Sequence, residues 1–184
     1  MRMQCLAWPQ FLENGLPKYK RTSMTVGIFD GVHRGHQALI KRIVSHNAGY
    51  APVIVTFRNN HKTNNKYQGD ILTFQQKMDK LQKLGIQLVI VIDFTKEFMQ
   101  MDGIKFLKIL LRHGNVGFFA AGSDFRCGYE LKTGAAEIQR FFASNGIPAE
   151  VVPQVMEGSL PISSSRIRSA IAAGDAALAE KMLG

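Results

Sequence analysis

The chain has 184 residues, of which 46% are hydrophobic and 20% are charged, values typical of a soluble one-domain protein with a buried core. No apolar run approaches the roughly 20 residues that span a bilayer, and the first residues lack the long apolar core of a signal peptide. Because two cysteines are too few for a disulfide framework, we expect the protein in a reducing cytoplasm.

The formal net charge of +9 predicts an anionic ligand: a nucleic acid, a membrane surface or a phosphorylated metabolite. The basic residues are scattered apart from Lys18-Tyr-Lys-Arg21, and they do not alternate with aromatic residues as in RNA-binding strands. A solvated basic surface accounts for much of this charge. We therefore expect small polyphosphate ligands, and neither a nucleic acid nor a membrane as partner.

The first predicted strand, residues 24–29, is apolar and β-prone, and it breaks at Asp30-Gly31. A helical pattern follows over residues 37–44, and His33 and His36 stand at the junction. If the helix begins near His33, both imidazoles lie on one face of its first turn. Free N–H groups and the helix dipole favour a phosphate there. Strand, turn, histidine pair and helix start therefore predict a phosphate cradle.

An isolated His-x-x-His pair also fits a surface pair, a helix cap or half of a metal site, so the motif needs supporting context. A zinc site requires three or four ligands, and the remaining histidines show no matching spacing to the two cysteines. Those histidines are His46, His61 and His113. The pattern thus favours phosphate over a metal ion.

Strand and helix patterns alternate along the rest of the chain. Buried strands are predicted at residues 51–57, 88–92, 116–121 and 149–152, and helices at residues 73–84, 104–111, 135–143, 164–173 and 176–183. The polar segment 61–69 is either a loop near the site or a plain surface loop. Apolar strands separated by helices indicate an α/β fold, a doubly wound parallel sheet in a single domain over residues 1–184. Ligands in such sheets bind at the carboxyl ends of the strands.

Two further motifs follow predicted strands. Gly122-Ser-Asp-Phe-Arg-Cys-Gly128 has glycines for close backbone approach, Asp124 for ribose hydroxyls and Arg126 for a phosphate, although alone it is only a turn. Ile162-Ser-Ser-Ser-Arg-Ile-Arg168 places hydroxyls at a helix start, which fits either an anion site or a well-capped surface helix. Its two arginines, two residues apart, must point in different directions.

These three motifs, in this order and spacing, resemble the FMN adenylyltransferase (FAD synthetase) module of bacterial bifunctional riboflavin kinase/FAD synthetases. That module belongs to the nucleotidylyltransferase superfamily, whose signatures are His-x-Gly-His and an Ile-Ser-Ser-Thr-x-x-Arg-like segment. The likeness runs from about residue 25 to residue 184. Three motifs in register are far more specific than any one of them.

The resemblance implies a Rossmann-like nucleotidylyltransferase fold that transfers AMP from ATP to FMN with Mg²⁺, giving FAD and pyrophosphate. The residues that it implies as catalytic are His33, His36 and Arg168. Those that it implies in ATP binding are Gly27, Phe29, Asp30, Gly35, Gly122, Asp124, Ser163, Ser164 and Arg166. Those that it implies in flavin binding are Phe57, Asn60, His61, Phe125, Arg126 and Cys127. The FMN phosphate is already an anion, so we expect a cationic site that holds two polyanions in line, with no general base.

The sequence departs from the family at three places. The family's Phe-(Glu/Asp)-Pro-His-Pro-like segment is replaced by Phe57-Arg-Asn-Asn-His-Lys62, which leaves the metal and flavin-side contacts open, with Asn60 or His61 as candidate stand-ins. Cys127 takes the place of an aromatic residue, which weakens the expected flavin stacking. The chain ends at Gly184, where the family usually continues into a riboflavin kinase domain. We therefore expect no kinase activity and an external supply of FMN.

Two alternatives remain at this level. One is a nucleotidylyltransferase of the same scaffold with another acceptor, such as nicotinamide mononucleotide, phosphopantetheine or a cytidine nucleotide, because the phosphate cradle is common to all of them. The other is a non-catalytic flavin- or nucleotide-binding descendant, supported by the altered segment after Phe57. The second and third motifs favour the flavin branch. The sequence carries no signal for an oligomeric state.

Overall fold

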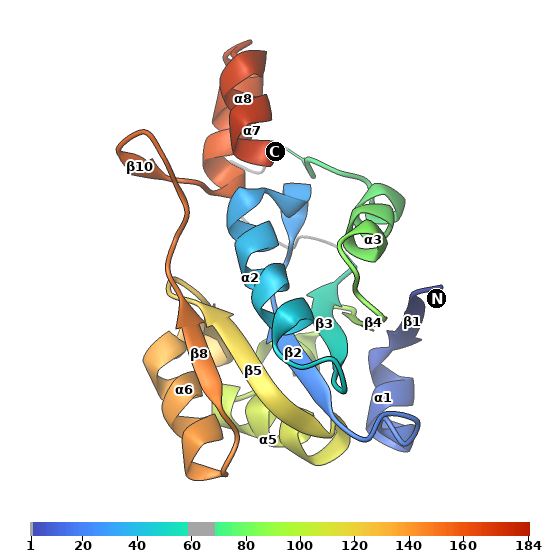
Figure 1. Cartoon of the computed structure of the whole chain (residues 1–184). Helices are drawn as coiled ribbons and strands as arrows, with labels where there is room; N and C mark the ends of the chain where they lie inside the picture. Colours follow the sequence, from blue (N-terminus) through green and yellow to red (C-terminus); the bar gives the residue numbers. More distant parts are fainter. Residues whose placement is uncertain (1, 59–68) are drawn as a thin grey trace.

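The computed structural model describes residues 2–58 and 69–184, and its centre is a six-stranded sheet in which all neighbouring strands are parallel (Figure 1). The strands of this sheet are β1 (Gln4–Ala7), β2 (Thr22–Val26), β3 (Ala51–Phe57), β4 (Leu88–Ile92), β5 (Val116–Gly122) and β8 (Ala149–Val152). The helices are α1 (Trp8–Asn14), α2 (Arg34–Ser45), α3 (Phe74–Lys83), α4 (Lys96–Met99), α5 (Gly103–His113), α6 (Ala135–Ser144), α7 (Ser164–Ala172) and α8 (Ala176–Leu183).

Short elements lie beyond the carboxyl edge of this sheet. They are the 3₁₀ turns η1 (Asp30–Val32) and η2 (Tyr129–Leu131), and two antiparallel pairs, β6 (Arg126–Cys127) with β7 (Thr133–Gly134) and β9 (Met156–Glu157) with β10 (Leu160–Pro161). The motifs singled out in the sequence lie in or beside these short elements.

The strand order β1-β4-β3-β2-β5-β8 places a switch point between β2 and β5. From β2 the chain runs outward through β3 and β4, and it then returns to the other side of β2 with β5 and β8. Ligands of such sheets bind in the crevice outside the carboxyl ends of the strands at the switch point. The segments that follow β2 and β5 therefore mark the expected site.

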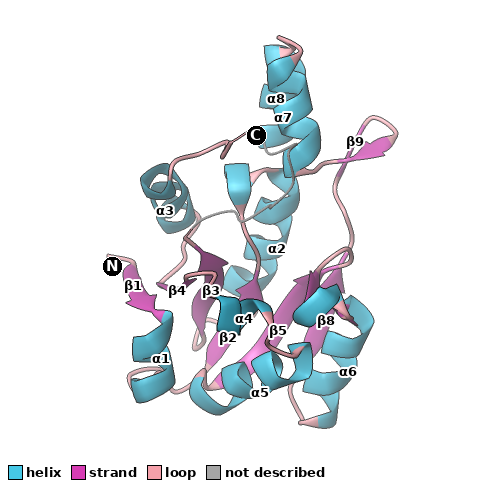
Figure 2. Cartoon of the chain, turned by 180° about the vertical axis from the view of Figure 1, so that it is seen from behind, coloured by secondary structure: helices cyan, strands magenta, loops and turns pink. Residues whose placement is uncertain are grey.

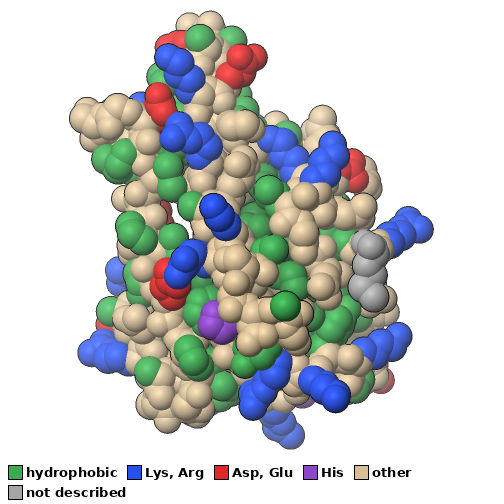
Figure 3. Space-filling model, in the orientation of Figure 1, with side chains coloured by type: hydrophobic (Ala, Val, Ile, Leu, Met, Phe, Trp, Pro, Cys, Tyr) green, Lys and Arg blue, Asp and Glu red, His purple; other side chains and the backbone are tan. Residues whose placement is uncertain are grey.

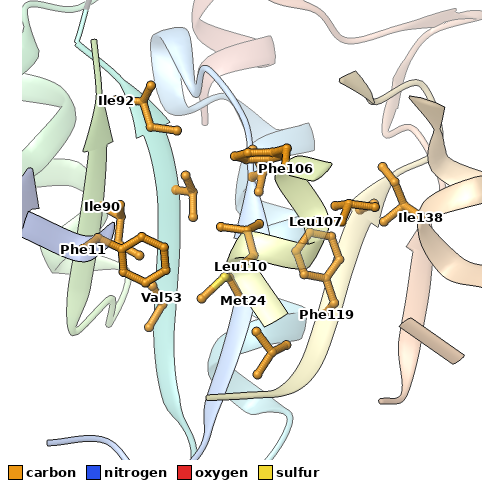
Figure 4. Packing of buried hydrophobic residues seen from close by; sticks show 14 of the residues in the cluster. Phe11, Met24, Val53, Ile90, Ile92, Phe106, Leu107, Leu110, Phe119 and Ile138 are labelled. Atoms are coloured by element: carbon orange, nitrogen blue, oxygen red, sulfur yellow. The ribbon is translucent and has the colours of Figure 1, made fainter. Parts of the chain in front are cut away.

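Helices cover both faces of the sheet (Figure 2). One core joins the sheet to α1, α5 and α6, and the other joins it to α2 and α3. Side chains alternate along β3, so Val53 and Val55 belong to the first core and Ile54 to the second. Figure 4 shows Leu110 of α5 beside Met24 of β2 within the first core. The core therefore fixes the strand ends from both sides.

The last two helices, α7 and α8, pack on each other beyond the carboxyl edge of the sheet (Figure 1). They share a small core of their own, made of Ile162, Ile167, Ala170, Ala179 and Met182. The hydroxyl of Ser164 donates to the backbone oxygen of Asp30 at 2.9 Å, which brings the start of α7 to the turn after β2. The third motif thereby meets the first.

The predicted doubly wound parallel sheet is confirmed, and most predicted helices and strands are found within a few residues of their expected bounds. The predicted strand 24–29 is wrong in its bounds: β2 ends at Val26, because Phe29 has a left-handed φ of 55° that a strand cannot contain. β1 and α1 were not predicted, since four and seven residues are too few to show a period. No helix in the described part of the chain is both long and apolar enough to cross a membrane.

Candidate active site

A pocket of about 850 Å³ opens at the carboxyl ends of β2, β3, β5 and β8. All three motifs contribute to its walls. The predicted residues that line it are Gly27, Phe29, His33, Gly35, His36, Phe57, Gly122, Asp124, Phe125, Arg126, Cys127, Ser163 and Ser164. Three predicted residues, Asp30, Arg166 and Arg168, do not line it. Asn60 and His61 fall outside the described residues.

The histidine pair forms a fixed stack at the start of α2. His33 is the N-cap residue, and its Nδ1 accepts the backbone N–H of His36 at 3.3 Å. The two imidazoles lie 3.6 Å apart between centroids with 17° between their planes, and the ring of Phe29 follows 5.1 Å from His36. Because Nδ1 of His33 is an acceptor here, its Nε2 carries the hydrogen and can donate it to an anion.

Two glycines leave room beside this stack. A Cβ atom at Gly35 would lie 3.1 Å from Cε1 of His33, and one at Gly27 would lie 3.0 Å from Cε2 of Phe29. A larger residue at either position would displace a ring that lines the pocket. The glycines of the first motif thus make room for the aromatic stack.

Both imidazoles are neutral at pH 7, which differs from the expected cationic site. Burial lowers the pKa of His33 to about 4, and the nearby carboxylates of Asp124 and Asp30 only partly oppose this shift. Burial also lowers the pKa of His36 well below its usual value, and the charges of His33 and Lys77 add to that effect. Nδ1 of His36 is buried and has no hydrogen-bond partner within the described ranges 2–58 and 69–184.

Asp30 ties the first motif to the third. Its Oδ2 forms a 2.7 Å ion pair with Nη1 of Arg168, and Oδ1 accepts the backbone N–H of Ile71 at 2.9 Å. Both members of the pair are buried, with 5% and 8% of their side chains exposed. The pair neutralises Arg168 behind the pocket wall, so in this structure the guanidinium does not face the cavity.

The serines at the start of α7 face the pocket, while Arg166 turns away from it. Ser163 is the N-cap, and its hydroxyl accepts the backbone N–H of Arg166 at 3.2 Å. The guanidinium of Arg166 donates to the carbonyl oxygens of Leu160 at 2.8 Å and Glu157 at 3.0 Å. Arg166 therefore holds the β9–β10 hairpin to α7, and Ser163 and Ser164 present hydroxyls and a helix N-terminus to the cavity.

The second motif forms the wall after β5. Oδ2 of Asp124 accepts from Nε2 of Gln154 at 3.0 Å, and Nε of Arg126 donates to the carbonyl oxygen of Leu131 at 2.8 Å. Burial raises the pKa of the Cys127 thiol to about 11, so it is a neutral apolar wall and not a nucleophile.

The other end of the pocket is aromatic and contains residues that the sequence analysis missed. Phe57 stacks on Phe94 with ring centroids 4.3 Å apart, and Phe98 meets both rings edge-on. Met99 and Met101 extend this wall. The signal was present in the sequence, since Phe94, Phe98 and the two methionines follow the carboxyl end of a buried strand as closely as the recognised motifs do.

The described residues form no metal cage at the site, and the basic side chains on one face of the molecule form no track (Figure 3). Among the described residues, no group of three or more His, Cys, Asp or Glu side chains is placed to hold a metal ion. Magnesium is commonly held by one or two carboxylates together with substrate phosphates, and Asp124 is one such carboxylate on the pocket wall. Lysine and arginine side chains are spread over the face in Figure 3 and do not form a single stripe.

Comparison with known proteins gives a consistent match. The sequence profile of the FAD synthetase family matches residues 16–166. The chain is 29% identical over 167 residues to a bifunctional riboflavin kinase/FMN adenylyltransferase from Escherichia coli K12, a match that covers 88% of this chain and 53% of the relative. The chain thus spans about half the length of the curated relatives that it matches.

Two solved structures share the fold. A protein from Streptococcus pneumoniae described as a macrolide-efflux protein superposes with a TM-score of 0.86 at 25% identity, over 99% of this chain and 62% of that one. A pantoate-β-alanine ligase from Francisella tularensis, in complex with β-γ ATP and β-alanine, superposes with a TM-score of 0.60 at 17% identity, over 89% of this chain and 72% of that one. The second likeness shows the fold alone.

Proposed function

Because the chain belongs to the FAD synthetase family, we propose that it transfers AMP from ATP to FMN, giving FAD and pyrophosphate. A phosphate oxygen of FMN attacks the α-phosphorus of ATP, the new P–O bond forms as the bond to the β-phosphate breaks, and pyrophosphate leaves with that electron pair. The attacking oxygen is already ionised, so no side chain has to remove a proton.

The observation that carries this proposal is one continuous pocket with two unlike ends. The polar end offers the stacked imidazoles of His33 and His36, the hydroxyls of Ser163 and Ser164, and the N-termini of α2 and α7. The aromatic end offers stacked rings for a flat apolar group. A polyphosphate fits the first end and an isoalloxazine ring fits the second.

Each end has a separate task in the transfer. Neutral imidazoles donate N–H hydrogen bonds to the phosphate oxygens that gain charge as pyrophosphate leaves, and the α7 N-terminus holds the β- and γ-phosphates. Asp124 and Gly122 seat the ribose side of ATP, and Phe57, Phe94 and Phe125 seat the flavin. We assign Arg168 an indirect role, in which its pair with Asp30 fixes the cradle.

Magnesium enters the proposal together with ATP. When bound, it neutralises part of the phosphate charge and helps to orient the oxygens. Asp124, a carboxylate on the pocket wall whose charge acts on His33, would contribute a ligand to it. This chain's residues supply the remaining orientation, through the His33–His36 stack and the serines of α7.

The same pocket separates the proposal from the two alternatives. Phe57, Phe94 and Phe98 favour a large flat acceptor over nicotinamide mononucleotide or phosphopantetheine. The preserved His33–His36 stack favours catalysis over binding alone. The activity that we propose for this chain is the adenylyl transfer, because the matching family model, over residues 16–166, is that of an FAD synthetase.

The test is a product assay with several acceptors. The purified chain is incubated with ATP, Mg²⁺ and FMN, riboflavin or nicotinamide mononucleotide, and the products are separated by chromatography. We expect FAD from FMN and no FMN from riboflavin. A dinucleotide formed from nicotinamide mononucleotide, without FAD, would establish the other acceptor, and flavin binding without any product would establish the binding-only descendant.

A further inference from the structure

Lys77 of α3 is a buried lysine outside the pocket lining, with 7% of its surface exposed. Its Nζ donates to the carbonyl oxygens of Phe57 at 2.8 Å and Ile28 at 3.2 Å, and it lies 3.5 Å from Oγ1 of Thr56. A buried ammonium is costly unless its N–H groups are satisfied. These three acceptors match its three donors, so the site is built for this side chain.

The acceptors lie where β2 and β3 separate. The paired register of the two strands ends at Val26 and Val55, and the N–H of Gly27 still donates to the carbonyl oxygen of Val55 at 3.1 Å. Beyond that point the hydroxyl of Thr56 donates to the carbonyl oxygen of Ile28 at 3.1 Å. Side chains thus continue a connection that the backbones of the two strands no longer make.

The two carbonyl acceptors, Ile28 and Phe57, each lie at the start of one end of the pocket. Ile28 leads directly into Phe29, whose ring lies beside His36 at the polar end. Phe57 stacks on Phe94 at the aromatic end. A single ammonium therefore holds the starting points of both ends.

Three charged groups act near Lys77: Asp30 in η1, Arg58 after β3 and Asp70 before α3. The carboxylates of Asp30 and Asp70 favour its charged form, but burial outweighs them and lowers the pKa of Lys77 to about 8. Arg58 lies over the same Phe74 ring as Lys77. The charge of Lys77 in turn lowers the pKa of His36.

We propose that Lys77 is a positioning residue whose bonds to Ile28 and Phe57 set the spacing between the polar and aromatic ends of the pocket. The inference rests on the proposed function, because transfer of AMP to FMN requires the two ends to hold ATP and FMN at the correct distance from each other. A misplacement of reacting groups by about 1 Å costs on the order of 10²-fold in rate. A lysine that only filled space would have no such effect on the reaction.

The first test needs no substrate. It measures the clamp, by which we mean the bonds of the Lys77 ammonium to the carbonyl oxygens of Ile28 and Phe57. Hydrogen exchange by mass spectrometry compares Lys77→Met with Lys83→Met, which removes an exposed lysine from the last turn of the same helix. We expect faster exchange over residues 25–31 and 53–58 in Lys77→Met alone, and equal exchange over residues 149–152. Exchange that is the same in both variants at all three segments would overturn the clamp, whatever the chain catalyses.

The second test measures the reaction. We expect kcat/KM for FAD formation to fall by about 10²-fold in Lys77→Met and by less than about twofold in Lys83→Met. In the wild type, kcat/KM should fall as the pH rises through about 8, where Lys77 loses its proton. Lys77→Arg stays charged over that range and should lack this alkaline limb. Terminal phosphate groups have pKa values near about 6, so both substrates keep their charge there.

The outcomes separate the two proposals. Failure of the wild type to form FAD contradicts the proposed function, and the exchange experiment still decides the clamp. An alkaline limb that persists in Lys77→Arg, or a Lys77→Met variant as active as Lys83→Met, would overturn the positioning role. If Lys77→Met does not fold, the pH profiles of the wild type and Lys77→Arg decide the matter without it.

Discussion

The polar end of the pocket is held by contacts within and between two helix starts, whereas the aromatic end is assembled from strands and loops that are distant in the chain. His33 caps α2 and stacks on His36 three residues later, and Ser163 caps α7. Phe57 is instead the last residue of β3, and Phe94 and Phe125 come from the segments after β4 and β5. The polar end thus fixes the positions of hydrogen-bond donors, whereas the aromatic end fixes the shape of an apolar surface.

This difference has a consequence for function. A change at the polar end should lower kcat or the stability of the fold, because each donor there has one direction and one partner. A change at the aromatic end should alter the affinity for one substrate, because neighbouring rings share the contact area. Variants at the two ends should therefore differ in which quantity they change.

Breaking the buried pair behind the polar end should have the largest effect. Arg168→Ala leaves the carboxylate of Asp30 buried without its partner, so the free energy of unfolding should fall by about 3–5 kcal/mol. Urea denaturation measures this value. Arg140→Ala removes an exposed pair with Glu137 and should cost less than about 1 kcal/mol. Equal stability of the two variants, with weaker ATP binding in Arg168→Ala, would instead assign Arg168 a direct phosphate contact.

Removing one donor of the polar end should reduce the rate. We expect His36→Ala to lose on the order of 10²–10³ in kcat, with little change in ATP or FMN affinity, as for loss of one transition-state donor. Steady-state kinetics of FAD formation measures this effect. The exposed His46 at the end of α2 supplies the control variant His46→Ala. Near wild-type turnover in His36→Ala would remove this residue from the mechanism.

Acid should weaken the folded state through the same histidines. The pKa of His33 is about 4 in the folded protein against a usual value of 6.5, so the unfolded chain binds more protons between these values. Stability should therefore fall as the pH drops through that window, by roughly 3 kcal/mol for this one group. Urea denaturation from pH 7 to pH 4 measures the slope. His33→Gln should show a smaller slope, and an unchanged slope would contradict the burial of a neutral His33.

Truncating one ring of the aromatic end should have the smallest effect. Phe94→Ala should raise the KM for FMN by roughly 2- to 13-fold, the worth of one aromatic pair, with kcat and the KM for ATP unchanged. Tyr129→Ala removes an exposed ring that does not line the pocket and should leave both KM values unchanged. A large loss of kcat in Phe94→Ala would show that the two ends are not separable in this way.

The same division explains what the sequence could and could not predict. His33, Gly122 and Ser163 could be identified because each stands at the carboxyl end of a strand or at a helix start, where local chemistry determines its use. The approach of Arg168 to Asp30 could not, because the two residues are 138 positions apart and only the packing of α7 over the turn after β2 brings them together.

The charge states of the site residues could not be predicted from the sequence either. A motif of histidines and arginines predicted a cationic site, but burial makes His33 and His36 neutral and Asp30 neutralises Arg168. Lys77 carried no signal, because one lysine in an amphipathic helix is indistinguishable from a solvated one until its neighbours are known. Fold and motifs were therefore predictable, whereas partners across the fold were not.

In the proposed function, a single pocket holds ATP at its polar end and FMN at its aromatic end. A crystal structure with FMN and a non-cleavable α,β-methylene analogue of ATP tests it most directly. The account predicts triphosphate oxygens within hydrogen-bond distance of His33, His36 and the serines of α7, with the flavin ring between Phe57 and Phe125. A flavin ring bound outside this pocket, or phosphates remote from the histidine pair, would contradict it.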